Sequence, residues 1–318
     1  MTIGMTKDYK EPKTAFLFPG QGAQKVGMGL EIFKASAAAQ DVFKQADEAL
    51  GRKLSKVIFE GPEEELKQTM NTQPGITATS IACMKAMEEL LGSENMPNAQ
   101  LMAGHSLGEY TALSAAGVLN IGDTLKLVLK RGELMQQACE ENPGTMAAII
   151  GLDESSLTEI VIQTGAYISN INMPDQIVIS GENMSIARAI DLAKARGAKR
   201  AIPLKVGGAF HSGLMEPAKE GLIETISNLD FHDPLVPIIA NCNAEPLTNG
   251  ENIKRELISQ ISTCVQWSKS MDYMVTEGIT KFIEIGPGRA LSGMMKRFGQ
   301  NVTTLSINDP DSIQELTS

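Results

Sequence analysis

Cysteine is scarce in this sequence, and the few cysteines form no recognisable pattern. The 318 residues include four, namely Cys83, Cys139, Cys242 and Cys264, and none of them forms a Cys-x-x-Cys pair or a spacing typical of zinc sites. This usage argues against a disulfide framework, and no cluster of metal ligands is visible in the sequence. It is typical of a reducing compartment, so we expect a cytoplasmic protein without a metal ion.

Aromatic residues and positive charge are also in short supply. Phe, Trp and Tyr together make up 4% of the chain, and the formal net charge is −10. A chain of this charge repels nucleic acid overall, and it offers few rings on which bases could stack. We therefore expect no nucleic-acid partner.

Long hydrophobic runs and nucleotide-binding glycine motifs are absent as well. No apolar run approaches the length of a membrane span, so we expect no membrane segment. The sequence has no Gly-Lys-Ser/Thr, and the glycines between positions 20 and 29 do not form a Gly-x-Gly-x-x-Gly motif. Residues 1–12 lack the apolar core of a signal peptide, and we predict that they are a disordered lead.

What the sequence does contain is an alternation of strand-like and helix-like segments. Short apolar runs, the mark of buried strands, separate amphipathic stretches of helical period. The runs that we predict as strands of the main sheet span 15–18, 100–103, 234–241, 281–285 and 302–307. This alternation predicts a largely parallel α/β sheet covered by helices, with functional groups at the carboxyl ends of the strands.

Residues 144–207 follow a different order. Their apolar and amphipathic segments read β-α-β-β-α-β, which is the ferredoxin-like pattern. The segment is long enough to form a subdomain by itself. We therefore predict a ferredoxin-like small subdomain over 144–207, inserted into a large catalytic α/β domain that consists of 13–143 and 208–318.

One predicted strand ends in a serine between two glycines. Residues 104–108 read Gly-His-Ser-Leu-Gly, and the segment 107–116 that follows has helical character. Gly-x-Ser-x-Gly between a strand and a helix is typical of a nucleophile elbow, a tight turn that exposes the serine hydroxyl above the sheet. Glycines at a strand end also make ordinary turns, so the interpretation depends on whether a base can reach Ser106.

A serine hydroxyl needs a base within hydrogen-bond reach, and the sequence has three histidines. His105 adjoins Ser106, and adjacent side chains of an extended segment point to opposite faces. His232 precedes a predicted strand, as a surface or structural residue would. His211 lies among small residues where the insertion returns to the main domain, and we predict that it is the base. No acidic residue between Ser106 and His211 falls at a strand end, which favours a dyad whose imidazole is oriented by a backbone carbonyl or an amide side chain.

Seven motifs occur together in an order and spacing that resemble those of malonyl-CoA:acyl carrier protein transacylases. They are FPGQGAQ, GHSLGEYTAL, KRGELMQ, NINMPDQIVISG, AFHSGLM, QISTCVQWSKSM and EIGPG. The resemblance runs from about Thr14 to Ile307, nearly the whole chain. It implies a hydrolase-like large domain with a ferredoxin-like insertion, the same architecture that the segments predict by themselves.

The resemblance implies a role for each matching residue. Ser106 looks like the acylated nucleophile, His211 looks like its base, and the backbone carbonyl of Gln260 looks like the group that orients the histidine. The backbone N–H groups of Gln21 and Leu107 look like the oxyanion hole, and for Leu107 the mechanics of the elbow agree.

Three further positions concern the substrate. Arg131 matches the arginine that holds the malonyl carboxylate, and Asn172 lies in the family's asparagine-containing turn near the substrate cleft. Phe210 stands where some members have the serine of a Pro-Ser-His tripeptide. In related polyketide acyltransferases a phenylalanine before the histidine accompanies malonyl, so Phe210 predicts a malonyl-sized pocket.

The activity implied by the resemblance is a ping-pong transfer that needs no cofactor or metal ion. Malonyl-CoA acylates Ser106, and the phosphopantetheine thiol of acyl carrier protein then takes the malonyl group, feeding fatty acid chain elongation. The expected partners are malonyl-CoA and acyl carrier protein, and a monomer is the default expectation.

Other functions remain open at this point. A stand-alone, trans-acting acyltransferase or an acyl-editing hydrolase of a polyketide synthase would have the same fold and the same serine, although Arg131 gives a hydrolase little advantage. A general serine esterase would want a third, acidic triad member. A non-catalytic carrier-binding module would not need Ser106, His211 and Arg131.

Overall fold

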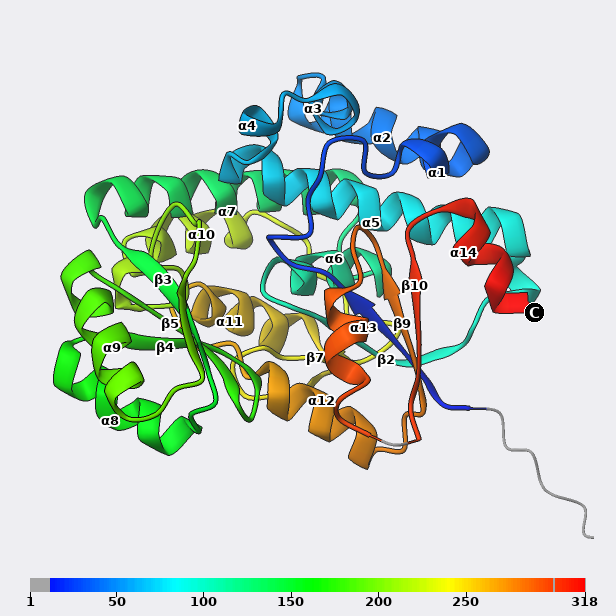
Figure 1. Ribbon diagram of the computed structural model, residues 1–318. Helices are drawn as coiled ribbons and strands as arrows, with labels where there is room; N and C mark the ends of the chain where they lie inside the picture. The colour runs from blue at the N-terminus through cyan, green and yellow to red at the C-terminus, as the bar shows by residue number, and fades with distance from the viewer. Residues whose placement is uncertain (1–11, 300, 318) are drawn as a thin grey trace, which may run out of the picture.

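The computed structural model describes residues 12–299 and 301–317, so the predicted lead over 1–12 lies outside the described residues except for Pro12. Its larger sheet has six strands in the order β10-β9-β1-β2-β7-β8, parallel except for the last pair (Figure 1). The strands are β1 (Thr14–Phe18), β2 (Ala99–Gly104), β7 (Ile238–Ile239), β8 (Pro246–Leu247), β9 (Lys281–Ile285) and β10 (Thr303–Ile307).

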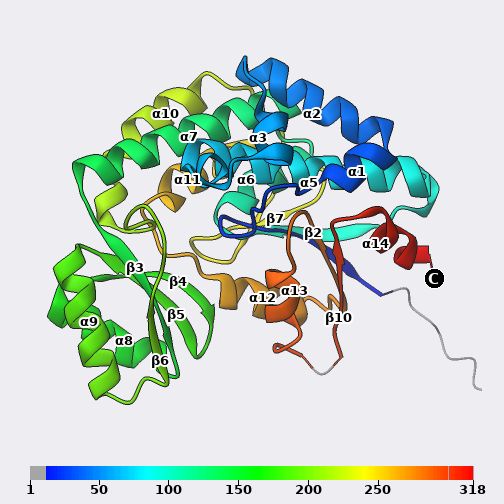
Figure 2. The same cartoon turned by 45° about the horizontal axis from the view of Figure 1, so that its top comes forward.

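Helices cover both faces of this sheet. Before the insertion the chain forms α1 (Leu30–Ala35), α2 (Ala37–Leu50), α3 (Leu54–Glu60), α4 (Glu63–Leu66), α5 (Thr69–Leu91), α6 (Leu107–Ala115) and α7 (Ile121–Glu141). After it come α10 (Ala218–Ser227), α11 (Gly250–Gln260), α12 (Trp267–Thr276), α13 (Ala290–Met295) and α14 (Pro310–Gln314). Three 3-10 turns span Ser93–Asn95, Gly213–Met215 and Glu315–Thr317. Figures 1 and 2 show α5 and α7 side by side beneath the layer formed by α1–α4.

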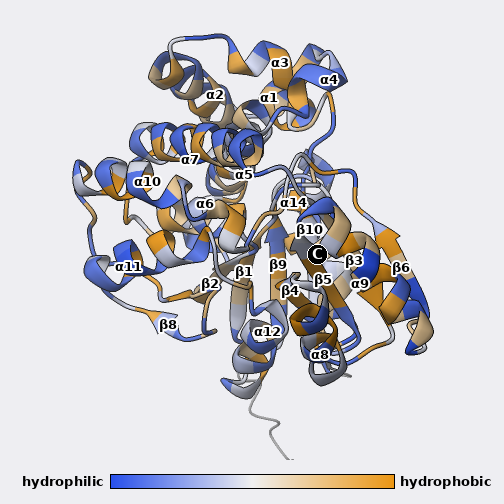
Figure 3. Cartoon of the chain, turned by 90° about the vertical axis from the view of Figure 1, so that its left-hand side faces the viewer, coloured by the Kyte–Doolittle hydropathy of each residue, from blue (hydrophilic) through white to orange (hydrophobic). Residues whose placement is uncertain are grey.

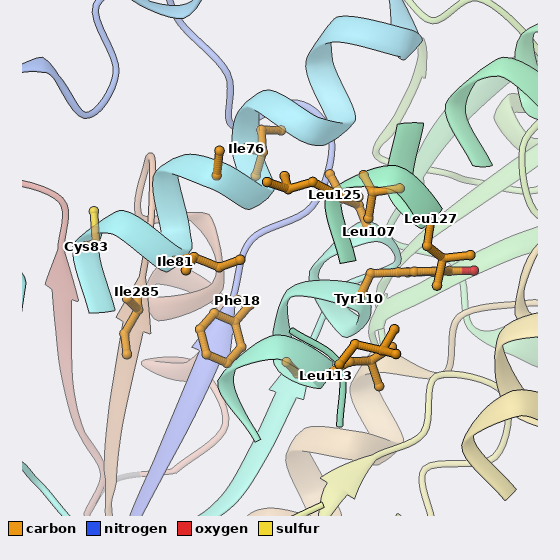
Figure 4. Packing of buried hydrophobic residues seen from close by; sticks show 14 of the residues in the cluster. Phe18, Ile76, Ile81, Cys83, Leu107, Tyr110, Leu113, Leu125, Leu127 and Ile285 are labelled. Atoms are coloured by element: carbon orange, nitrogen blue, oxygen red, sulfur yellow. The ribbon is translucent and has the colours of Figure 1, made fainter. Parts of the chain in front are cut away.

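The central strand β1 explains why two helical layers are needed. Successive side chains of a strand point to opposite faces, and every residue of β1 is buried. Phe16 and Phe18 pack with α5, α6 and α7 on one face, and Ala15 and Leu17 pack with α12 and α13 on the other. Figure 4 shows the first cluster from close by, and Figure 3 shows hydrophilic and hydrophobic bands alternating along the outer helices α2 and α7. A strand buried on both faces is typical of a parallel α/β sheet.

The second sheet has four strands, all antiparallel, in the order β4-β5-β3-β6. It consists of β3 (Thr145–Ile150), β4 (Tyr167–Met173), β5 (Gln176–Gly181) and β6 (Arg200–Pro203), with α8 (Glu154–Thr164) and α9 (Asn183–Ala195) between them in the chain. The β-α-β-β-α-β order confirms the predicted fold class, a parallel α/β sheet with a ferredoxin-like insertion. These elements lie within the predicted 144–207, whereas the subdomain boundaries themselves stay predictions.

One predicted strand is much shorter than expected. Of the run 234–241 only Ile238 and Ile239 form β7. Pro234 and Pro237 have no N–H to donate to a ladder, so the residues before Ile238 cannot pair as a regular strand. Residues 238–241 are buried as a strand predicts, but Leu235 is 85% exposed, so the strand prediction was wrong for 234–237.

The small sheet contacts the large domain through backbone hydrogen bonds of β4. An isolated parallel bridge joins Asn170 of β4 to Val265, which lies between α11 and α12. The N–H of Ile171 donates to the Val265 carbonyl at 2.9 Å, and the N–H of Val265 donates to the Ser169 carbonyl at 2.8 Å. The small sheet is thereby held against the segment that links α11 to α12.

Candidate active site

The serine turn has the backbone strain expected of an elbow. Ser106 follows β2, precedes α6 and has φ 52° and ψ −103°, a positive φ that side-chain-bearing residues rarely adopt. A Cβ on Gly104 would lie 1.9 Å from the Gly108 carbonyl carbon, and one on Gly108 would lie 2.0 Å from the Phe18 carbonyl oxygen. Glycine is therefore required on both sides of Ser106, because backbone fills the space where a side chain would stand.

His211 lies directly against this serine. Its Nε2 is 2.7 Å from Ser106 Oγ, and its Nδ1 is 2.9 Å from the carbonyl oxygen of Gln260, the last residue of α11. A carbonyl can only accept, so Nδ1 carries the proton and Nε2 is left to accept from the serine hydroxyl. This is the hydrogen-bond pattern of a serine with a general base, and here a backbone carbonyl stands where a triad has a carboxylate.

Protonation of His211 is strongly disfavoured. Burial, and after it the positive charge of Arg131, lower the pKa of His211 to about 3, although the hydrogen bond to the Gln260 carbonyl acts in the opposite direction. The imidazole is therefore neutral over the physiological pH range, which is the form that can accept a proton.

Arg131 brings a buried positive charge next to the serine. It lies on α7 and is 1% exposed. Nη1 donates to Gln73 Oε1 at 2.9 Å, and Nη2 donates to Gln260 Oε1 at 2.9 Å and to Ser106 Oγ at 3.2 Å. Its Nε has no hydrogen-bond partner among the described residues, and no ion pair between Arg131 and an acidic side chain is found there. Neutral amides thus hold the guanidinium and leave its charge available to an anion.

These groups line a cavity of about 200 Å³ between the two sheets. Its lining combines polar groups with apolar side chains from α7, the second sheet and the 204–210 segment. The lining residues are Gln21, His105, Ser106, Arg131, Met135, Met146, Asn170, Asn172, Val178, Leu204, Val206, Phe210 and His211. A small, mostly apolar cavity with a few convergent polar groups is what a short acyl chain with one charged end would fit.

Two backbone N–H groups are free to act on a ligand. Leu107 is the first residue of α6, and the N–H groups of a helix's first turn have no partner within the helix. Across residues 12–299 and 301–317, neither Leu107 nor Gln21 donates its N–H to another protein group. Leu107 N–H also lies at the positive end of the α6 dipole, which favours negative charge.

Comparisons with known proteins give the family. A family model described as "Acyl transferase domain" matches residues 15–307. The chain is 46% identical over 307 residues to the malonyl CoA-acyl carrier protein transacylase of Bacillus subtilis (strain 168), covering 95% of each chain. It belongs to the malonyl-CoA:acyl carrier protein transacylase family. The resemblance predicted from the motifs is confirmed, and the protein is an acyltransferase.

Solved structures of transacylases agree in fold as well as in sequence. An acyl-carrier-protein S-malonyltransferase from Bartonella henselae superposes with a TM-score of 0.92 at 38% identity, covering 96% of this chain and all of that one. A malonyl-transacylase in complex with a type II polyketide synthase acyl-carrier protein has a TM-score of 0.91 at 36% identity, covering 96% and 98% of the two chains. The transacylase fold therefore extends over nearly all of this chain.

The cavity brings together six of the eight residues singled out from the sequence, and the other two adjoin it. Gln260 and Leu107 do not line the cavity, but the Gln260 carbonyl contacts His211, and Leu107 follows Ser106 directly. The structure brings these residues together, while the roles assigned to them stay predictions.

The other two histidines differ from His211 in their surroundings. His105 Nε2 contacts Asn172 Oδ1 at 2.8 Å, and its ring packs edge-on against Trp267 at 5.4 Å between centroids. It lines the cavity but forms no hydrogen bond with Ser106 Oγ. His232 is 68% exposed, and its Nε2 lies 4.0 Å from Asp230, which agrees with the surface position expected for it.

Sequence reasoning missed three polar residues around the site. Gln73 of α5 holds Arg131, Asn241 Oδ1 accepts the N–H of Ser106 at 2.7 Å, and Glu109 of α6 contacts both Asn241 and Gln260. All three are at most 3% exposed. No spacing motif marks Gln73 or Asn241. Glu109 does have a sequence signal, because Ser106 and Glu109 form the Ser-x-x-Glu pattern of a capping box.

Two negative findings apply to residues 12–299 and 301–317. No group of three or more His, Cys, Asp or Glu side chains there is placed to hold a metal ion. In the same ranges, none of the helices combines the length and the apolar character needed to cross a membrane.

Proposed function

We propose that the protein transfers the malonyl group of malonyl-CoA to the phosphopantetheine thiol of an acyl carrier protein, and so supplies fatty acid chain elongation. The names of the relatives support the substrates, since both the Bacillus subtilis protein and the Bartonella henselae structure are malonyl transferases acting with acyl carrier protein. The observation that carries the proposal is Arg131, a buried guanidinium beside Ser106 that is held by neutral amides.

The first half-reaction acylates Ser106. His211 Nε2 takes the hydroxyl proton while Oγ forms a bond to the thioester carbon, and the carbonyl oxygen becomes an oxyanion. The N–H groups of Gln21 and Leu107 stabilise that charge. When the tetrahedral intermediate collapses, the C–S bond breaks, and His211 returns its proton to the departing thiolate of coenzyme A.

The second half-reaction runs through the same groups. His211 takes the proton of the phosphopantetheine thiol, and the sulfur attacks the malonyl ester. Collapse of the second tetrahedral intermediate breaks the bond to Ser106 Oγ, which recovers its proton from His211. No redox step or further reactant is needed for the balance, so we propose that the transfer needs no cofactor.

Arg131 supplies the selectivity in this proposal. Malonyl differs from acetyl by one carboxylate, and a planar guanidinium can bind a carboxylate through two parallel hydrogen bonds. Phe210, 7% exposed, and Asn172, 8% exposed, line the cavity. We propose that Phe210 limits the size of the acyl group and that Asn172 contacts the acyl-thioester. Longer neutral acyl groups would bury Arg131 without a partner for its charge.

A test of the proposal is the intact mass of the protein after brief exposure to malonyl-CoA. One malonyl adduct is expected, absent in Ser106→Ala and passed to phosphopantetheinylated carrier protein when an excess of that protein is added. His211→Ala should acylate about 10²–10⁴-fold more slowly, whereas His232→Ala should match the wild type. An adduct that persists in Ser106→Ala would refute the assignment of the nucleophile.

A polyketide assembly line is the second candidate setting, because a structural relative is bound to a carrier of that kind. Rates of transfer to a fatty-acid carrier and to a polyketide carrier, measured side by side, distinguish the two. Release of free malonate faster than transfer would instead indicate an editing hydrolase. We further propose that the protein acts as a monomer in the cytoplasm; its four cysteines are all free, and light scattering during gel filtration tests the monomer.

A further inference from the structure

The N-terminus of α6 departs from the capping that its sequence predicts. Ser106-Leu107-Gly108-Glu109 has the form Ser-x-x-Glu, the capping-box pattern, in which the serine oxygen accepts from the N–H three residues on and the glutamate accepts from the serine N–H. In the structure the Ser106 side chain makes no capping bond, because Oγ faces His211. The N–H of Ser106 donates instead to Asn241 Oδ1 at 2.7 Å.

The carboxylate released from that capping role is fully buried and holds two other residues. Glu109 is 0% exposed. Its Oε1 accepts the backbone N–H of Asn241 at 3.0 Å, and its Oε2 accepts from Nε2 of Gln260 at 2.7 Å. Both of these partners already contact the residues proposed for catalysis.

Gln260 is the more consequential of the two. Its side-chain Nε2 also donates to the Ser106 carbonyl at 2.8 Å, its Oε1 accepts from Arg131, and its backbone carbonyl accepts from His211. Burial and the charge of Glu256 raise the pKa of Glu109, while its hydrogen bonds with Asn241 and Gln260 act in the opposite direction. Both of its oxygens accept, so the NH₂ side of the Gln260 amide faces it. The oxygen side then faces Arg131, so Glu109, the Ser106 carbonyl and Arg131 together hold the Gln260 amide in one orientation.

Asn241 carries the second connection. Besides accepting from Ser106 N–H, its Nδ2 donates to the Gly104 carbonyl at 2.8 Å, so its side chain ties both sides of the elbow. The bond from its backbone N–H to Glu109 fixes the main chain from which that side chain extends.

We propose that Glu109 is a positioning residue for acyl transfer: its carboxylate fixes Gln260 and Asn241, and through them the backbone of Ser106, the imidazole of His211 and the guanidinium of Arg131. This inference rests on the proposed function for the reaction that it serves. Glu109 does not line the cavity, so it acts through other residues and not on the substrate.

The substitution that tests this is Glu109→Gln. The shape is kept, but a carboxamide has one accepting oxygen for two donating partners, and its NH₂ group must face either Asn241 N–H or Gln260 Nε2. A buried donor without an acceptor typically disfavours the arrangement that contains it by about 10–100-fold. We therefore expect single-turnover acylation of Ser106 to slow by about 10–100-fold with malonyl-CoA and acetyl-CoA alike.

Glu256→Gln is the matched control. Glu256 is a second buried acid, 8% exposed, whose Oε1 accepts the N–H of Cys242 at 2.8 Å, a bond that an amide oxygen can also accept. Among the described residues its side chain forms no hydrogen bond with Gln260 or Ser106. Its charge raises the pKa of Glu109, so its removal favours the ionised form of Glu109. The Glu256→Gln variant should therefore acylate within about threefold of the wild type. If Glu109→Gln does not fold, Glu109→Asp, which keeps the charge but is one methylene shorter, takes its place, with a loss of at least about threefold expected.

A double-mutant cycle separates positioning from a purely structural role. Gln260→Ala removes the amide but keeps the backbone carbonyl that contacts His211. If Glu109 acts through that amide, adding Glu109→Gln to Gln260→Ala should slow acylation much less than it slows the wild type, whereas independent structural effects would multiply. Acylation of Glu109→Gln at the wild-type rate, an equal loss in Glu256→Gln, or multiplicative losses in the cycle would each overturn the inference. Failure of the wild type to acylate would refute the proposed function instead.

Discussion

Removal of Arg131 should separate malonyl from acetyl transfer, and the structure gives the reason. The guanidinium is 1% exposed, and its hydrogen bonds go to Gln73, Gln260 and Ser106. No acidic side chain among residues 12–299 and 301–317 forms an ion pair with it. Among the described residues that line this cavity, Arg131 alone is a Lys or Arg. Arg131→Ala would therefore remove the positive charge that meets a substrate carboxylate there, while Ser106 and His211 keep their contact.

The expected size of the effect on kcat/KM follows from the burial of the Arg131 guanidinium. Loss of one partner of a buried, hydrogen-bonded charge pair costs about 2–5 kcal/mol, and 1.4 kcal/mol corresponds to a factor of ten. Water that enters the space left by the side chain can solvate the malonyl carboxylate and offset part of this cost. We expect kcat/KM for malonyl-CoA to fall by about 10–1,000-fold. Acetyl-CoA has no carboxylate to lose, so its transfer should stay equal or improve.

The assay measures initial rates of transfer from both thioesters to the same carrier protein. Arg131→Ala also removes the donor from the buried Gln73 and Gln260 oxygens, so we expect the variant to melt at a lower temperature than the wild type. Acetyl transfer uses the same fold and the same dyad, and the malonyl-to-acetyl ratio therefore isolates the effect of the carboxylate. Arg131→Lys should recover only part of that ratio, because an ammonium group lacks the planar fork. Equal falls for both substrates would refute the reasoning and make Arg131 a structural residue.

Three other predictions concern the same site. Because burial and Arg131 lower the pKa of His211 to about 3, kcat/KM should show no acid limb near the ordinary histidine value of about 6.5, and Arg131→Ala should move the limb to higher pH; a wild-type limb near 6.5 would contradict this. In the unfolded chain His211 has its ordinary pKa and binds a proton at a higher pH than in the folded protein. The contribution of His211 should therefore make the free energy of unfolding fall as pH falls from about 6.5 towards 3, as urea titration can measure. Gly108→Ala should abolish detectable acylation and lower the melting temperature, since its Cβ would lie 2.0 Å from a backbone oxygen, whereas Gly293→Ala in α13, with nothing within 4 Å, should fold and acylate normally.

Local patterns were enough to predict the fold class. Alternating strand-like and helix-like segments indicated the parallel sheet, and the β-α-β-β-α-β order of 144–207 indicated the ferredoxin-like insertion. Both signals are periodicities that a segment carries by itself. The length of a strand is harder to predict than its existence, because it depends on which residues the neighbouring strand pairs with. In β7 only Ile238 and Ile239 pair with β2, and Pro234 and Pro237 before them have no N–H to donate.

The elbow and its base were predictable because their chemistry restricts residue types. A turn with backbone packed on both sides of Ser106 admits only glycine at 104 and 108, and with three histidines in the chain few bases were available. Gln73 and Asn241 were beyond reach, since a buried amide can serve any backbone or side-chain partner, and its partner here lies more than fifty residues away. Their positions follow from the packing of α5 and of the segment after β7 against the elbow.

The arrangement around Arg131 shows why amides and not carboxylates hold it. A buried guanidinium is most simply stabilised by an acidic side chain in direct contact, but such a pair would already satisfy the charge that a malonyl carboxylate has to meet. Here Gln260 stands between Arg131 and Glu109, donating to the carboxylate through Nε2 and accepting from the guanidinium through Oε1. The acid therefore stays one side chain away from the site, and burial raises its pKa. The electrostatic cost of an unpaired Arg131 is relieved when a dicarboxylate-derived acyl group binds. On this reasoning Gln260→Glu would pair with Arg131 and exclude malonyl from its site. It would also place a second acid against Glu109 Oε2, which now accepts from Gln260 Nε2 at 2.7 Å, so the variant should be less stable than the wild type.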